Sequence, residues 1–71
     1  MSKAMSTAIR FISYDAESER LSVTFVTGRR YIYENVPENI YDAFLSASSR
    51  GQFFNFEIRD RYPCREVKRS A

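Results

Sequence analysis

The chain has 71 residues, of which 44% are hydrophobic and 28% are charged, and its formal net charge is +2. This length provides one small domain, and this composition is typical of a folded globular protein rather than a disordered one. No apolar run is long enough for a membrane span, and residues 1–8 lack the apolar core of a secretory signal. A single cysteine excludes an internal disulfide and fits a reducing compartment, so we expect a cytoplasmic protein.

The first half of the chain predicts three strands. β-Branched and aromatic residues indicate a first strand over residues 7–14, in which the apolar alternation slips between Phe11 and Ile12. Either partial cover on both faces or a β-bulge at that point explains the slip. Residues 20–26 alternate cleanly, which predicts a second strand with one buried face. A third strand over residues 29–34 completes an antiparallel meander.

The loop of the second hairpin, which contains Gly28, decides where Tyr31 and Tyr33 point. A two-residue loop of Thr27 and Gly28 places both tyrosines on the polar face, open to a ligand. A three-residue loop with Gly28 in a bulge instead pairs Val23 with Tyr31 and places both rings in the core. We favour the buried register, because a slip of one residue moves the whole apolar set of a strand to the other face.

The second half of the chain predicts two helices. Pro37 suits the first turn of a helix, and apolar residues follow at helical spacing as far as Ala47. Residues 48–51 interrupt this pattern and predict a connector, after which a second helix runs over about residues 52–60. Pro63 then excludes further helix. The predicted fold class is α+β, with a three-stranded antiparallel meander followed by two helices packed on one face, in the order β-β-β-α-α.

The composition gives little support to enzyme chemistry. The chain has no histidine, which removes the commonest general base near neutral pH and the commonest metal ligand. Cys64 has arginines nearby but no histidine partner, so we interpret it as an incidental thiol. The acidic residues of the turn 15–19 lack the further ligands and the glycine of a calcium loop. Two glycines are too few for a phosphate loop. We therefore expect no catalytic residue, no metal and no cofactor.

Nucleic-acid binding has better support. Aromatic rings stack on the bases of single-stranded RNA while arginine and lysine contact its phosphates. Nine of the eleven basic residues are arginine, and residues 48–71 hold six basic groups against three acidic ones. The alternative is that the arginines form a solvated surface and the tyrosines belong to the core. The candidate RNA-binding residues are Arg29, Arg30, Tyr31, Tyr33, Arg50, Arg59 and Arg61.

A protein–protein interface is the competing hypothesis. An uncovered sheet face carrying Val26 and Ile32 would suit a protein partner or a second copy of the chain. A homodimer would also add to the small core of a 71-residue domain.

An ordered set of residues recurs along most of the chain: Ile9, Tyr14-Asp15, Leu21, Val23, Phe25, Gly28, Tyr31, Tyr33, Val36-Pro37, Tyr41, Ala47, Ser49, Gly51, Phe54, Asn55, Ile58, Arg59 and Tyr62. This set resembles the KTSC domain, a module named from the C-terminus of certain lysyl-tRNA synthetases that also occurs as small free-standing bacterial proteins. Cys64 departs from the pattern, at a position where we expect an aromatic residue. The resemblance implies one domain over residues 6–67. The residues outside it, 1–5 without periodicity and the basic segment 68–71, are expected to be loose tails. The resemblance implies no established activity, and RNA binding is suggested only by the attachment to a synthetase.

Overall fold

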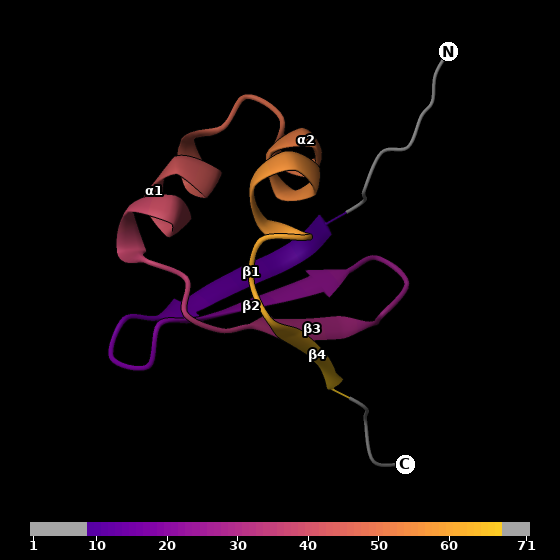
Figure 1. Ribbon diagram of the computed structural model, residues 1–71. Helices are drawn as coiled ribbons and strands as arrows, with labels where there is room; N and C mark the ends of the chain where they lie inside the picture. The colour runs from indigo at the N-terminus through magenta and orange to yellow at the C-terminus, as the bar shows by residue number, and fades with distance from the viewer. Residues whose placement is uncertain (1–8, 68–71) are drawn as a thin grey trace.

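The computed structural model describes residues 9–67, which form a four-stranded antiparallel sheet and three helical segments. The elements in chain order are β1 (Ile9–Asp15), β2 (Arg20–Phe25), β3 (Arg30–Tyr33), α1 (Glu38–Ser46), α2 (Arg50–Phe53), the π-helix η1 (Phe54–Ile58) and β4 (Cys64–Val67). The strands lie in the order β1-β2-β3-β4. Figure 1 shows the helices gathered on one face of the sheet, as predicted for this α+β fold.

Strand β4 is the element that the sequence analysis missed. Its residues pair with β3, from Tyr33 opposite Cys64 to Arg30 opposite Val67. The backbone N–H of Glu34 donates to the Pro63 carbonyl at 2.9 Å and extends the contact beyond the strand. A segment of four residues with two charges carries no strand periodicity, and it is the free edge of β3 that supplies its hydrogen bonds. The expected tails at 1–5 and 68–71, and the expected start of the first strand at residues 7 and 8, lie outside the described residues.

The β2–β3 hairpin has the buried register. Val23 lies opposite Tyr31, and Leu21 lies opposite Tyr33. The Phe25 N–H donates to the Arg29 carbonyl at 2.8 Å, which leaves a three-residue loop, and Gly28 within it has a φ of 95°. Tyr33 is 3% exposed and Tyr31 is half-buried, so both rings face the helices. The prediction that they join the core is confirmed.

A β-bulge in β1 explains the irregular alternation of the first strand. The register with β2 shifts between Ile9 and Phe11, so the bulge lies at Arg10 rather than between Phe11 and Ile12. As a result Ile9 and Ile12 pack against the core on the helix side. Phe11 lies opposite Thr24 on the other face and is 62% exposed.

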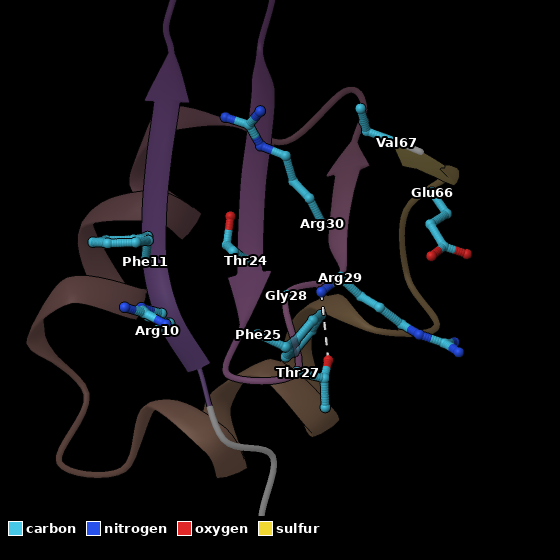
Figure 2. Close-up of a pocket in the computed structure, with 10 residues that line it drawn as sticks. All are labelled: Arg10, Phe11, Thr24, Phe25, Thr27, Gly28, Arg29, Arg30, Glu66 and Val67. Atoms are coloured by element: carbon cyan, nitrogen blue, oxygen red, sulfur yellow. Dashed lines mark hydrogen bonds between the residues drawn. The ribbon is translucent and has the colours of Figure 1, made fainter. Parts of the chain in front are cut away.

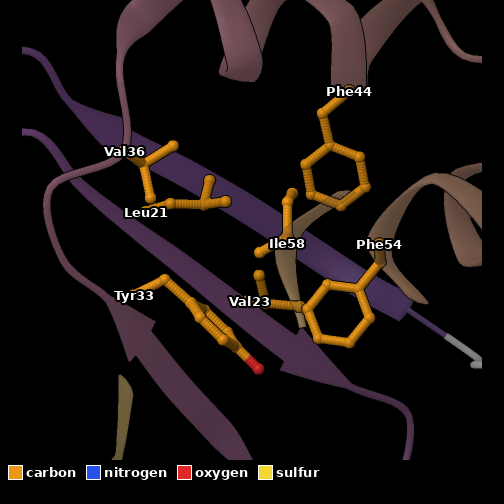
Figure 3. Packing of buried hydrophobic residues seen from close by; sticks show 7 residues of the cluster. All are labelled: Leu21, Val23, Tyr33, Val36, Phe44, Phe54 and Ile58. Atoms are coloured by element: carbon orange, nitrogen blue, oxygen red, sulfur yellow. The ribbon is translucent and has the colours of Figure 1, made fainter. Parts of the chain in front are cut away.

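The core lies between the sheet and the helices and is centred on Phe54. The Phe54 ring meets Phe25 and Tyr33 edge-on at centroid distances of 5.5 Å and stacks on Phe44 at 6.5 Å. Such aromatic pairs each add about 0.5–1.5 kcal/mol beyond the area that they bury. The buried cluster, drawn in Figure 3, consists of Leu21, Val23, Tyr33, Val36, Phe44, Phe54 and Ile58.

The second helical region begins earlier than predicted and changes its winding part-way. The Ser49 hydroxyl accepts a hydrogen bond from the Gln52 N–H at 3.3 Å and caps α2. After one α-helical turn the chain enters the π-helix η1, where the Arg59 N–H donates to the Phe54 carbonyl at 2.8 Å. The longest helix in the described range, α1, has nine residues, and none there has the length and apolarity that a membrane crossing requires.

Candidate nucleic-acid interface

The sheet face opposite the helices is uncovered, and we call it the open face. Its side chains come from the positions that alternate with the core residues of each strand. It is polar and basic, with Phe11 as its one aromatic ring among the described residues. The open face consists of Phe11, Ser13, Asp15, Arg20, Ser22, Thr24, Arg30, Ile32, Arg65 and Val67.

One end of the open face, beside the β2–β3 turn, is hollowed to a volume of ≈ 700 Å³ (Figure 2). We call this concavity the hollow. The exposed ring of Phe11 lines it, and the guanidinium of Arg10 lies 5.5 Å from the centre of that ring. This distance is within the range of a cation–π contact. The bulge at Arg10 therefore places a cation and an aromatic ring side by side.

Arginine dominates the charge of the hollow. Arg10, Arg29 and Arg30 line it together with a single carboxylate, that of Glu66. The only ion pair within residues 9–67 joins Arg65 to Glu34 at 3.8 Å. The three arginines of the hollow thus have no carboxylate partner in the described part of the chain and can bind an external anion.

A second concavity, which we call the groove, lies on the helix side of the sheet and has a volume of ≈ 620 Å³. Tyr31, Tyr33 and Cys64 line it from the sheet, and Asn55 and Arg59 line it from η1 and the residue that follows. Burial raises the pKa of the Tyr33 hydroxyl, and the neighbouring Cys64 thiol raises it further. The shift extends to higher pH the range over which Tyr33 keeps its proton.

The predicted site residues divide between these two concavities. Arg30 lies in the hollow, Arg29 borders both concavities, and Tyr31, Tyr33 and Arg59 line the groove. Tyr31 and Tyr33 therefore do not share a face with Arg30, because successive residues of a strand point to opposite sides.

Arg50 and Arg61 line neither concavity. Arg50 begins α2, and Arg61 is exposed in the turn that follows η1. Val26 lies in the hairpin turn and lines the groove, so only Ile32 of the predicted apolar pair is on the open face.

Two residues of the hollow, Arg10 and Phe11, were missed by the sequence analysis. The available signal was the broken alternation of the first strand, which indicated that one of its apolar residues does not face the core. The pattern alone did not identify Phe11 as that residue, because the position of a bulge depends on pairing with β2.

A hydrogen bond within the acidic turn between β1 and β2 stabilises that turn. The Glu17 N–H donates to the Asp15 carboxylate at 3.1 Å, as in an Asx-turn. Within residues 9–67, no three histidine, cysteine or acidic side chains gather in a way that could hold a metal ion.

Comparison with known proteins identifies the family. The KTSC domain model matches residues 5–62, which is most of the chain. The chain belongs to the KTSC domain family. The crystal structure of a KTSC domain protein from Yersinia pestis has a TM-score of 0.82 and 35% sequence identity, with 90% of each chain covered.

Two further relatives are bacterial. A protein from Tsukamurella paurometabola is 34% identical over 62 residues, which cover 87% of this chain and 92% of that protein. A protein from Stutzerimonas stutzeri is 42% identical over 50 residues, or 70% of each chain. Strand β4 of this KTSC domain follows the segment that the family model matches.

The residues that carry the KTSC resemblance are unevenly placed in the structure. Many belong to the core, and six line the groove, whereas Arg10, Phe11 and Arg30 of the hollow are not among them. The six are Phe25, Tyr31, Tyr33, Phe54, Asn55 and Arg59.

Proposed function

We propose that this KTSC domain binds single-stranded RNA on its open face, with the hollow at the centre of the contact. The observation that carries the proposal is the grouping of Arg10, Arg29 and Arg30, without carboxylate partners in the described chain, around the exposed ring of Phe11. This grouping matches the two requirements of single-strand binding, which are cations for the backbone and a ring for a base.

The chemistry of each group suits that role. A guanidinium donates two parallel hydrogen bonds to a phosphate, which favours arginine over lysine at such a site. The 62% exposure of Phe11 leaves its face accessible, and stacking of a base on an aromatic ring contributes about 1–3 kcal/mol. The Thr24 hydroxyl beside it can hydrogen bond to the 2′-hydroxyl that distinguishes RNA from DNA.

The charge of the open face favours a polyanion over a second copy of the same face. Two like-charged faces repel each other when they meet, which opposes a symmetric dimer through this surface. The face and its margins carry five basic groups against three acidic ones, namely Arg10, Arg20, Arg29, Arg30 and Arg65 against Asp15, Glu34 and Glu66.

Fluorescence anisotropy with a labelled mixed-sequence RNA of about 12 nucleotides tests the proposal. We expect the logarithm of the affinity to fall linearly with the logarithm of the salt concentration, with a slope of about −2 if three phosphates are contacted. Arg30→Glu removes a charge-assisted contact and should weaken binding at least about tenfold. Arg50→Glu makes the same charge change outside both concavities and should have a much smaller effect.

Two results would contradict the proposal. One is no binding at low salt, and the other is an equal loss in Arg30→Glu and Arg50→Glu, which would indicate attraction by net charge alone. Sedimentation of the free chain tests the competing homodimer. A mass of two chains that Ile32→Asp reduces to one would favour an interface between copies.

A further inference from the structure

The groove and the hollow adjoin each other at the β2–β3 turn. Phe25, Thr27 and Arg29 border both of them. An RNA strand that leaves the hollow over this turn therefore meets the groove next. Arg29 lies between the two concavities, where its guanidinium can contact a phosphate of that strand.

The π-helix gives the groove its polar wall. In an α-helix, residue i+5 lies about 140° round the axis from residue i. In a π-helix the i+5 hydrogen bond brings the two residues close to the same side, as the bond from Arg59 to Phe54 does here. Asn55 belongs to η1, Asp60 lies in the turn that follows it, and both line the groove. Single π-helical turns within helices are frequent at functional sites.

The lining of the groove combines aromatic walls with groups that recognise a base edge. Tyr31 meets Phe25 edge-on at 5.8 Å, and both rings line the groove. Asn55, Asp60 and the protonated hydroxyl of Tyr33 supply amide, carboxylate and hydroxyl groups. Enzymes that extrude a base hold it against aromatic or apolar side chains, with hydrogen bonds to its polar edge, and the groove offers both kinds of group. The volume of ≈ 620 Å³ is within the range of small-ligand sites.

Asp60 adds selectivity to this arrangement. Its carboxylate accepts hydrogen bonds and donates none, so it favours a base that presents an amine and disfavours one that presents a carbonyl oxygen. Carboxylates accept from the cytosine amine in the same way in protein–DNA complexes. Uracil has a carbonyl oxygen at that position, so the carboxylate discriminates between the two pyrimidines.

We infer that the groove binds one base of the RNA strand and that it selects cytosine over uracil through the Asp60 carboxylate. This inference rests on the proposed function, since the strand reaches the groove from the open face. In this arrangement the Asp60 carboxylate accepts a hydrogen bond from the cytosine amine.

Competition between oligo(C) and oligo(U) of equal length tests the inference, because the two differ at the base edge and share backbone and ring size. We expect the chain to bind oligo(C) about tenfold more tightly. Asp60→Asn should bring the ratio close to one, because an amide can also donate to the uracil oxygen. Glu57→Gln makes the same charge change at an exposed position of η1 outside the groove and should keep the ratio.

The outcomes separate the two proposals. Arg30→Glu should weaken the binding of oligo(C) and oligo(U) equally and leave the ratio of the two affinities unchanged. Equal binding of oligo(C) and oligo(U), with the Arg30→Glu loss intact, would overturn the base site and leave the open face in place. A preference that survives Asp60→Asn would also overturn the inference. Failure of both oligonucleotides to bind would overturn the proposed function together with it.

Discussion

Replacing Tyr14 with phenylalanine tests how the sheet is joined to the first helix. The Tyr14 hydroxyl donates to the Val36 carbonyl at 2.6 Å, which ties β1 to the loop before α1 across 22 residues. Its ring stacks on that of Tyr41 in α1, with centroids 4.8 Å apart and an interplanar angle of 16°. Tyr14→Phe keeps the ring and removes the hydrogen bond, so the carbonyl of a residue whose side chain is fully buried loses its partner.

The expected loss follows from the cost of that unsatisfied carbonyl. A lost hydrogen bond of this kind lowers the free energy of unfolding by about 1.5 kcal/mol. In a domain of this size each kcal/mol corresponds to ~4–8 °C, so the midpoint of thermal unfolding should fall by roughly 6–12 °C. Urea unfolding followed by far-UV circular dichroism measures the change in free energy directly.

Tyr41→Phe is the matched control for this prediction. It removes the same atom from the other ring of the stack, and within residues 9–67 the Tyr41 hydroxyl has no hydrogen bond comparable to that of Tyr14. We expect it to change the free energy of unfolding by much less. Equal losses in the two variants would show that the stack, and not the bond to Val36, holds the helix to the sheet.

Two further predictions concern backbone strain and alkaline pH. Glu19 has a φ of 57°, a left-handed conformation that asparagine adopts more readily than glutamate. Glu19→Asn should therefore raise the free energy of unfolding by roughly 0.5–1 kcal/mol. Glu17→Asn in the same turn should not raise it. A lower free energy of unfolding in urea for Glu19→Asn would refute the argument. Burial raises the pKa of Tyr33 above its ordinary value of 10.0, so near and above that pH the folded chain keeps a proton that the unfolded chain releases. The free energy of unfolding should be unaffected by Tyr33 below pH 10.0 and should decrease as the pH rises above that value. Tyr33→Phe should make this decrease smaller. An unchanged dependence of the free energy of unfolding on pH in Tyr33→Phe would contradict the assignment to Tyr33.

Much of the fold was predictable because one face of each central strand is buried. The alternation of Leu21, Val23 and Phe25 identified the buried face of β2, and the register that we favoured sets Tyr31 and Tyr33 against that face. Because successive side chains of a β-strand point to opposite faces of the sheet, Arg30 and Tyr31 lie on opposite faces. The amphipathic spacing that runs as far as Ala47 likewise identified the first helix, which ends at Ser46, although Leu45 is 41% exposed.

The candidate site depended on two local irregularities that periodicity does not reveal. The bulge at Arg10 places that residue and Phe11 beside Thr24, and its position is set by pairing with β2. Phe54 and Ile58 are four residues apart and face the core in either an α- or a π-helix, so the sequence does not distinguish the two.

The sequence by itself therefore indicated the fold class and favoured one hairpin register, because burial of one strand face constrains both, and its composition supplied the arginines and the aromatic rings. Only the tertiary structure decided which of these residues meet. Strand β4 forms on the free edge of β3, the bulge depends on pairing between β1 and β2, and the π-helix carries Phe54, whose ring packs on Phe25 and Tyr33 of the sheet. Each is a shift of backbone hydrogen bonds whose stability comes from contacts distant in the chain.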